Sequence, residues 1–459
     1  MYLKRKIDEY LQEWKNDEKH LPLLVVGIRQ CGKTESIKNF GQNNYKNVLY
    51  LNFWDDHQLC DDFNGELSVK NIINILSLRY PNIPIIEEET LIIFDEIQEC
   101  PRARLFLKNI AIDSKYDVIA TGSFLGINGY IYKDHTPVPV GYETIYKMKT
   151  LDFEEFLWAN GYNDKHIKIL EESFNNCKAI DNNIHELFKK LFQQYMCVGG
   201  FPKAVSTFIE THNISDSSKI VEDIIDQMKS DFGRRLDKRG NPLFKPSEVS
   251  RIITAFDLIP TYLAKENKRF ILSGINNGSS SEKRDSIKYL EDIGVVYKVY
   301  NLNLPSLPLD AHKKETLFKL FPTDIGIICT QYGYETLYSI YSGNLGVGKG
   351  ALYEAAVLDS LYKADIPVYY YAKNTGLEID FVVTYDHNAT LIEAKAKTGN
   401  TKASKTVLSH PEIYGKTHLI KIGDYNVGKN DNIMTIPHYM TFLLGRKKKL
   451  IVEDLSFKQ

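Results

Sequence analysis

The stretch LPLLVVGIRQCGKT, residues 21–34, decides the fold of the first part of the chain. Its apolar start has the pattern of a buried strand and leads directly into Gly27-Ile28-Arg29-Gln30-Cys31-Gly32-Lys33-Thr34, which fits GxxxxGK[ST]. The run TESIKNF that continues from Thr34 has a helical pattern. A strand, a glycine-containing loop and a helix in this order predict a phosphate-binding loop.

The residues of this loop have expected roles in holding a nucleoside triphosphate. Gly27 and Gly32 let successive backbone N–H groups curl around the β-phosphate, and the helix N-terminus adds a positive dipole end. We expect Lys33 to reach the β- and γ-phosphates and act in catalysis, and the Thr34 hydroxyl to bind Mg²⁺. The predicted nucleotide-binding residues of this segment are Gly27, Arg29, Gln30, Gly32, Lys33, Thr34 and Glu35.

A carboxylate pair follows another apolar run. Leu91-Ile92-Ile93-Phe94 leads into Asp95 and Glu96, as expected for a buried strand that ends beside the phosphate loop. Asp95 is predicted to hold the hydration shell of Mg²⁺, and Glu96 to orient or deprotonate the attacking water. Ser123 ends the next apolar run, YDVIATGS, and is predicted to contact the γ-phosphate, with a plain strand-end turn as the open alternative.

The pattern of the whole chain predicts four units. Apolar runs alternate with helical stretches over residues 1–150, which indicates an α/β fold with a parallel sheet. Helical patterns over 151–235, interrupted by the turn Gly199-Gly200-Phe201-Pro202, predict a helical extension of that unit. The order helix, turn, helix, strand predicts a winged-helix unit over 236–325, and residues 326–459 have the pattern of a further α/β domain.

Composition excludes several classes of protein. The 459 residues exceed one hydrophobic core, and 43% hydrophobic with 25% charged residues excludes collagen or a wholly disordered chain. Because the formal net charge is only −2, any surface that binds nucleic acid has to be a local basic patch and not a property of the whole chain. The six cysteines form no CxxC pair and no apolar run could span a membrane, so we expect a reducing, cytoplasmic location without a membrane partner.

Three carboxylates and a lysine near the C-terminus have the spacing of a metal site. Glu354 lies in a helical run, while Asp380 and Glu393 lie on two predicted strands joined by a hairpin (393 − 380 = 13 residues). Lys395 follows Glu393 by two residues and shares its strand face. This arrangement resembles the PD-(D/E)xK nuclease pattern, and the resemblance implies that Glu354, Asp380 and Glu393 bind Mg²⁺ and that Glu393 and Lys395 act in phosphodiester cleavage. An inactive scaffold with a Glu393–Lys395 ion pair remains the open alternative.

Together these motifs resemble a family of prokaryotic AAA-type, STAND-like P-loop ATPases with a restriction-endonuclease-like C-terminal domain of unknown function. The resemblance rests, in chain order, on GIRQCGKT, IIFDEIQEC, ATGS, LDFEEFL, VGGFPKAV and FPTDIGI. The C-terminal carboxylates resemble the PD-(D/E)xK nuclease pattern. The chain departs from the family at Glu35-Ser36, where Thr-Leu is commoner.

The resemblance implies ATP and Mg²⁺ as cofactors, hydrolysis of ATP, and a homo-oligomer as an expected assembly. An ATPase of this kind often needs an arginine that neutralises charge in the transition state. The candidates are Arg102, Arg104, Arg234 and Arg235.

Two functions remain open from the sequence. In the first, ATP turnover controls a metal-dependent nuclease that acts on DNA or RNA. In the second, ATP turnover drives a regulatory or signalling switch that binds DNA or a protein without cleaving it. The basic residues Lys283, Arg284 and Lys288 of a predicted recognition helix, and the basic run at 446–449, suit contacts with phosphates. The open alternatives are a unit used for protein packing or as a lid of the ATPase, and a solvated basic terminus.

Overall fold

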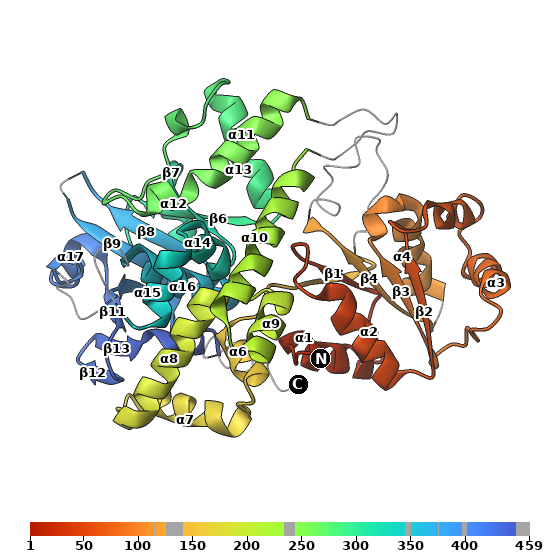
Figure 1. The fold of residues 1–459 in the computed structure, drawn as a ribbon, viewed down its shortest axis with the longest axis horizontal. Helices are drawn as coiled ribbons and strands as arrows, with labels where there is room; N and C mark the ends of the chain where they lie inside the picture. The colour runs from red at the N-terminus through yellow and green to blue at the C-terminus, as the bar shows by residue number, and fades with distance from the viewer. Residues whose placement is uncertain are drawn as a thin grey trace. The chain divides into compact units, whose positions relative to one another are not determined.

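The computed structural model describes residues 1–113, 115–124, 141–233, 244–344, 350–374, 376–396 and 402–446. The chain divides into two compact units, one of residues 1–150 with 292–294 and one of residues 151–291 with 295–459. Each unit contains a β-sheet of its own (Figure 1).

The sheet of the first unit has the strand order β2-β3-β4-β1-β5, and every neighbouring pair is parallel. Four of its strands coincide with the predicted apolar runs, and β1 and β3 are buried over their whole length. The predicted α/β fold with a parallel sheet is therefore confirmed for this unit. The strands are β1 Leu23–Val26, β2 Asn47–Asn52, β3 Thr90–Asp95, β4 Asp117–Gly122 and β5 Thr144–Lys147.

Helices and short 3₁₀ turns of the described residues precede or connect these strands. They are α1 Lys6–Asn16, α2 Lys33–Asn44, α3 Val69–Arg79, α4 Pro101–Asp113, η1 His57–Phe63 and η2 Ile97–Glu99. An aromatic core fixes the end of β3, because the Phe94 ring lies 5.6 Å from that of Phe53 and 5.7 Å from that of Phe63. Phe63 in turn packs edge-on against Phe106 of α4, with ring centres 5.8 Å apart. The turns that follow β2 and β3 thus rest on one packed cluster.

The second unit contains an eight-stranded mixed sheet in the order β12-β13-β11-β10-β9-β8-β6-β7. Its strands are β6 Val296–Leu302, β7 Lys313–Pro322, β8 Val368–Ala372, β9 Glu378–Tyr385, β10 Asn388–Ala394, β11 Thr417–Gly423, β12 Gly428–Asn430 and β13 Ile433–Pro437. Strand β6 pairs in parallel with β8, with Tyr300 opposite Tyr369. The segment predicted as a winged helix and the predicted C-terminal domain therefore share one sheet and one compact unit.

The described part of the second unit also contains helices. Those of the predicted helical extension are α6 Phe153–Ala159, α7 Asp164–Asn175, α8 Asn182–Val198, α9 Pro202–Thr211 and α10 Ile214–Asp231. The others are α11 Pro246–Asp257, α12 Ile259–Leu263, α13 Ser280–Asp292, α14 Ile325–Gln331, α15 Tyr334–Tyr341, α16 Gly350–Lys363, α17 Lys402–Leu408 and α18 Pro411–Tyr414. Short 3₁₀ turns lie at η3 Leu272–Gly274, η4 Leu309–His312 and η5 His438–Met440.

A buried ion cluster connects helices of the second unit. The Nζ atom of Lys363, on α16, lies 3.0 Å from Asp324 Oδ2 and 2.9 Å from Asp359 Oδ1. It also donates to the carbonyl oxygen of Leu151 and to the hydroxyl of Tyr195, at 3.0 and 2.9 Å. Burial alone would lower the pKa of Lys363, but the two carboxylates outweigh it and raise that pKa. Lys363 therefore carries its positive charge inside the core of the second unit.

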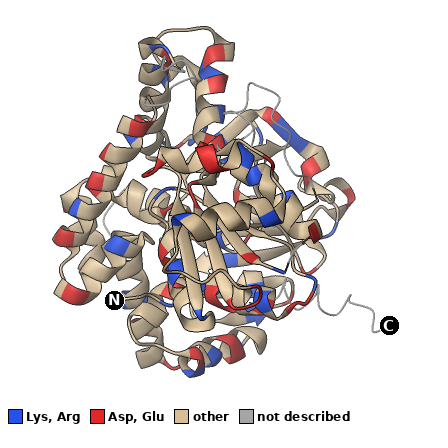
Figure 2. Ribbon diagram, turned by 90° about the vertical axis from the view of Figure 1, so that its right-hand side faces the viewer, with Lys and Arg blue, Asp and Glu red and all other residues tan. Residues whose placement is uncertain are grey.

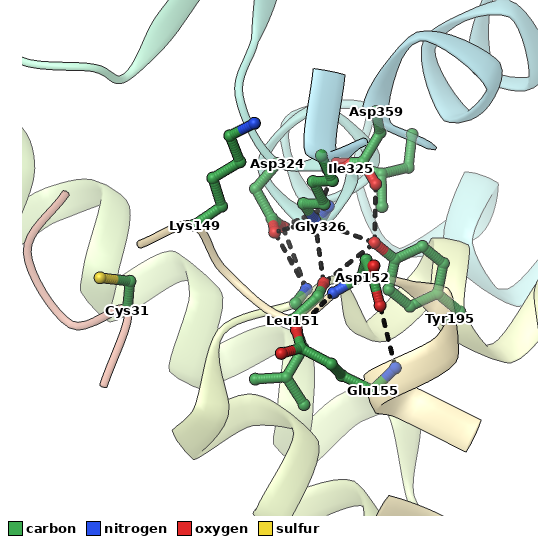
Figure 3. Close-up of polar contacts among 12 residues, drawn as sticks. Cys31, Lys149, Leu151, Asp152, Glu155, Tyr195, Asp324, Ile325, Gly326 and Asp359 are labelled. Atoms are coloured by element: carbon green, nitrogen blue, oxygen red, sulfur yellow. Dashed lines mark hydrogen bonds and ion pairs between the residues drawn. The ribbon is translucent and has the colours of Figure 1, made fainter. Parts of the chain in front are cut away.

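The carboxylates of the cluster have further donors (Figure 3). Asp324 accepts from the backbone N–H groups of Gly200 and Gly326, at 3.0 and 2.8 Å, and Tyr195 donates its hydroxyl to Asp359 at 2.6 Å. Burial raises the pKa of Asp359 to about 6, against the lowering effect of the lysine. The landmarks that meet at this cluster are LDFEEFL, VGGFPKAV and FPTDIGI.

We predict that Lys363→Met lowers the free energy of unfolding by about 3–5 kcal/mol, because removing the lysine leaves two buried carboxylates without their cation. Chemical denaturation of the full chain, compared with wild type, measures this loss. Lys405→Met, at an exposed position of α17, is the matched control and should change the stability little. Equal stability of the two variants would contradict a charged cluster.

Candidate functional site

The phosphate loop joins β1 to α2 in the first unit, as predicted. Gly32 has a φ of 99°, a left-handed conformation that favours glycine, and it immediately precedes the helix. A Cβ atom on Gly27 would lie 2.4 Å from the carbonyl oxygen of Met148, so only glycine fits there. The Nζ atom of Lys33 lies 3.1 Å from the carbonyl oxygens of both Gly27 and Ile28, folded back over the loop.

Three hydroxyl groups converge on the carboxylate of Asp95 at the end of β3. Thr34, from α2, donates to Oδ1 at 3.0 Å, and Tyr50, from β2, donates to Oδ2 at 2.6 Å. Thr121, from β4, donates to Oδ1 as well. The structure thus places the two predicted Mg²⁺-binding residues, Thr34 and Asp95, in direct contact. Hydroxyl and carboxylate oxygens are the hard ligands that Mg²⁺ prefers, so this pair fits the ion.

Glu96, the predicted catalytic carboxylate, begins a tight turn next to Asp95. Its backbone has φ 53° and ψ 46°, and its N–H donates to the Thr121 hydroxyl at 3.2 Å. The Gln98 side chain donates to the Glu96 carboxylate and accepts from the backbone N–H of Ser123 at 3.4 Å. A short chain of hydrogen bonds therefore connects Glu96 to Ser123, the residue predicted to contact the γ-phosphate.

The structure also places the remaining predicted nucleotide-binding residues. Arg29, Gln30 and Glu35 are exposed on the loop and the first turn of α2. The Arg29 guanidinium carbon lies 5.9 Å from the centre of the Trp54 ring, within the range of a cation–π contact.

Two of the four candidate arginines have contacts within the first unit. Arg104 forms an ion pair with Glu143 at 2.6 Å, and both side chains are almost wholly buried. Arg102 donates to the carbonyl oxygen of Gly65 at 2.7 Å. These contacts give both arginines a structural role, whereas Arg234 and 235 lie outside the described residues.

In the second unit Asp380, Glu393 and Lys395 converge, as predicted. Strands β9 and β10 form the predicted hairpin, and Lys395 Nζ lies 2.9 Å from Asp380 Oδ2 and 2.8 Å from Glu393 Oε2. The Ser404 hydroxyl donates to Glu393, and the N–H of Ala394 donates to Asp380 at 3.0 Å. Burial and the neighbouring Asp380 raise the pKa of Glu393.

Glu354 has other partners. It forms ion pairs with Lys268 and, at 3.3 Å, with Lys319, which also pairs with Glu378 at 2.9 Å. Burial would lower the pKa of Lys319, but Glu354 and Glu378 outweigh it and raise that pKa. Both carboxylate oxygens of Glu354 are therefore paired with lysines.

The predicted metal ligands of the second unit are thus paired with lysines. Among the residues that the structure describes, no group of three or more His, Cys, Asp or Glu side chains is placed to hold a metal ion. Asp380 and Glu393 share the ammonium group of Lys395, and Glu354 is neutralised by two further lysines. Sequence analysis missed Lys268 and Lys319 because they precede the predicted domain.

The predicted basic surfaces are diluted by acidic residues. Figure 2 shows Lys and Arg interspersed with Asp and Glu along the helices and strands. Ile287 and Leu290 of α13 are buried. Arg446 forms ion pairs with Glu154 and Glu171, and 447–449 lie outside the described residues. Within the described ranges, no helix has the length and apolar character needed to cross a membrane.

The fold and the site of the first unit define a P-loop nucleotide-binding domain. Residues 19–157 match the family model of an AAA domain, which supports an AAA-type ATPase in this segment. Residues 189–337 and 349–439 match two domains of unknown function, DUF8612 and DUF4143. These two matches name no activity for the second unit.

Individual proteins are similar to the chain over most of its length. The uncharacterized protein MJ1637 of Methanocaldococcus jannaschii is 23% identical over 474 residues, which cover 96% of this chain and 88% of that protein. The Walker-type ATPase PABY2304 of Pyrococcus abyssi is 12% identical, with 72% of this chain and 96% of that chain covered and a TM-score of 0.39. The ORC2 protein of Aeropyrum pernix, in its ADPNP–ADP complexes, is 12% identical over 75% of this chain and 95% of that chain, with a TM-score of 0.36.

We predict that Tyr50→Phe destabilises the position of the Asp95 carboxylate, because it removes the hydroxyl that donates to Oδ2. Removing a hydrogen bond to a charged group should lower the free energy of unfolding by about 1.5 kcal/mol. It should also raise the Mg²⁺ concentration needed for half-maximal ATP hydrolysis, because Asp95 loses one of its three donors. Urea denaturation and a Mg²⁺ titration measure these effects. Tyr80→Phe, at a half-buried tyrosine after α3, is the control that should change neither quantity.

Proposed function

We propose that the protein binds ATP with Mg²⁺ and hydrolyses it at the phosphate loop of the first unit. The contact that carries this proposal is the 3.0 Å hydrogen bond between the Thr34 hydroxyl and Asp95, because it brings together the two residue types that hold Mg²⁺ in P-loop enzymes. The match of residues 19–157 to an AAA domain supports the same activity.

The residues of the site have distinct tasks in this proposal. Mg²⁺ neutralises charge on the phosphates, and Thr34 and Asp95 would hold it, Asp95 through the hydration shell. Lys33 leaves the carbonyl oxygens of the loop and pairs with the β- and γ-phosphates, while backbone N–H groups bind the phosphate oxygens. Glu96 orients the attacking water and accepts its proton, and Ser123 contacts the γ-phosphate.

We predict that Lys33→Ala reduces ATP hydrolysis at least about 100-fold, since a catalytic electrostatic contact of this kind contributes about 3 kcal/mol or more. Glu96→Gln should hydrolyse ATP as poorly and yet bind it, because the amide has nearly the shape of the carboxylate but cannot accept the proton of the attacking water. Phosphate release and nucleotide binding are the two measurements. Lys70→Ala, at an exposed position on α3, is the control. Undiminished turnover in Lys33→Ala would sink the proposal.

We further infer that ATP turnover serves a regulatory or signalling switch whose second unit binds nucleic acid or a protein without cleaving it. The lysine contacts of the carboxylates support this choice, because Lys268, Lys319 and Lys395 already neutralise the groups that a metal ion would need. A homo-oligomer, in which a neighbouring copy supplies an arginine to the nucleotide, stays a prediction.

A metal-dependent nuclease coupled to ATP turnover is the second candidate. The convergence of Asp380, Glu393 and Lys395 on one edge of the β9–β10 hairpin favours it. In that case Asp380 and Glu393 would hold a divalent cation that activates the phosphodiester, and Lys395 would have to release at least one of the two carboxylates.

Cleavage of labelled single- and double-stranded DNA and RNA, with Mg²⁺ or Mn²⁺ and with or without ATP, separates the two functions. We predict no cleavage by wild type while ATP hydrolysis continues, as expected for the switch. Cleavage by wild type that disappears in the Glu393→Ala, Lys395→Ala double variant would instead establish the nuclease. Cleavage retained in that variant would indicate a contaminant.

A further inference from the structure

Two thiol groups lie together where strands β2 and β3 of the first unit end. Cys60 lies in η1, which follows β2, and Cys100 directly follows η2, after β3. The Cys60 thiol donates to the carbonyl oxygen of Glu99, the residue before Cys100, with a sulfur–oxygen distance of 3.6 Å. Cys100 is buried in the hydrophobic cluster of the first unit, and Cys60 packs against that cluster. Both cysteines are reduced in this structure. They form a close thiol pair that the proposed ATPase site does not use.

Other contacts fix the two turns that carry these thiols. Strands β2 and β3 are parallel neighbours, and the N–H of Phe53 donates to the carbonyl oxygen of Asp95 at 3.1 Å, so both turns leave the same edge of the sheet. Arg102, in the first turn of α4, donates to the carbonyl oxygens of Phe63 and Gly65 just after η1. These contacts hold η1 against the start of α4, so the two cysteines remain neighbours.

The two thiols differ in exposure and in acidity. Cys60 is half-buried, whereas Cys100 is 2% exposed. The neighbouring Cys100 lowers the pKa of the Cys60 thiol, and Cys60, together with burial, raises the pKa of Cys100. Thiolate character and solvent access make a cysteine reactive. Cys60 is therefore the sulfur that attacks, and Cys100 the one that resolves.

We propose that Cys60 and Cys100 form a reversible disulfide when the protein meets a low-molecular-weight disulfide such as oxidised glutathione. The Cys60 thiolate attacks one sulfur of that molecule, its S–S bond breaks, and one glutathione leaves with the proton that Cys60 released. Cys100 then gives up its proton, attacks the Cys60 sulfur and displaces the second glutathione, which takes that proton. The two protein thiols lose two electrons, and oxidised glutathione is reduced to two thiols.

The new bond would tether the turn that carries the proposed catalytic carboxylate. Glu96 precedes η2, Cys100 follows it, and Gln98 within it hydrogen-bonds to Glu96. A link from this turn to η1 restricts the adjustment of Glu96 around the attacking water. We therefore expect the oxidised protein to hydrolyse ATP several-fold more slowly than the reduced protein. This consequence rests on the proposed ATPase function, but the disulfide itself does not.

Incubation of the full chain with oxidised glutathione, followed by peptide mass mapping without reductant, tests the proposal. We expect one peptide in which Cys60 is linked to Cys100, and its disappearance with dithiothreitol. Cys100→Ser should retain a stable glutathione adduct on Cys60, whereas Cys60→Ser should give neither an adduct on Cys100 nor the link. Cys177→Ser, which removes a half-buried cysteine of the second unit, is the matched control and should keep the link.

Two results would overturn the disulfide. One is a wild-type protein in which Cys60 stays unmodified under conditions that modify Cys177. The other is a glutathione adduct on wild-type Cys60 that never resolves to the link with Cys100. A linked peptide in a protein that hydrolyses no ATP in either redox state would instead keep the disulfide and overturn the proposed function. A linked protein with unchanged turnover would overturn only the tethering of Glu96.

Discussion

Asp95 lies at the end of a fully buried strand, where its charge has to be met by donors from neighbouring elements. Three hydroxyl groups donate hydrogen bonds to this carboxylate, those of Thr34, Tyr50 and Thr121, and each comes from a different helix or strand. The carboxylate therefore ties the phosphate-loop helix α2 to the centre of the sheet. The positions of the Glu96 turn and of the phosphate loop both depend on this convergence.

The same constraint shapes the second unit, although lysines rather than hydroxyls satisfy it. Lys363 lies among Asp324, Asp359 and the carbonyl oxygen of Leu151 in the core, where an uncompensated charge would be costly. At the β9–β10 hairpin Lys395 bridges two carboxylates that would otherwise repel each other. Carboxylates that resemble a metal site in sequence are thus held by the ammonium groups of the protein itself.

Sequence predicted much of the first unit and less of the second. Strands β1 to β4 could be predicted because fully buried parallel strands are continuous apolar runs. The loop before Lys33 could be predicted because the spacing of its glycines and lysine is characteristic of a phosphate-binding loop. Tyr50 was missed, since one polar residue on a strand does not reveal which neighbour it faces. The winged-helix prediction for 236–325 rested on element order, and this order does not indicate that β6 pairs with β8.

The sequence by itself determined the phosphate loop, the carboxylates after β3 and the Asp380–Glu393–Lys395 grouping, because the spacing along one strand or turn fixes which side chains are neighbours. Only the tertiary structure decided which partners those groups have. Lys319 reaches Glu354, and Cys60 reaches Cys100, across segments 35 and 40 residues apart in the chain (354 − 319 and 100 − 60). Such contacts follow from strand order and helix packing, which local spacing does not encode.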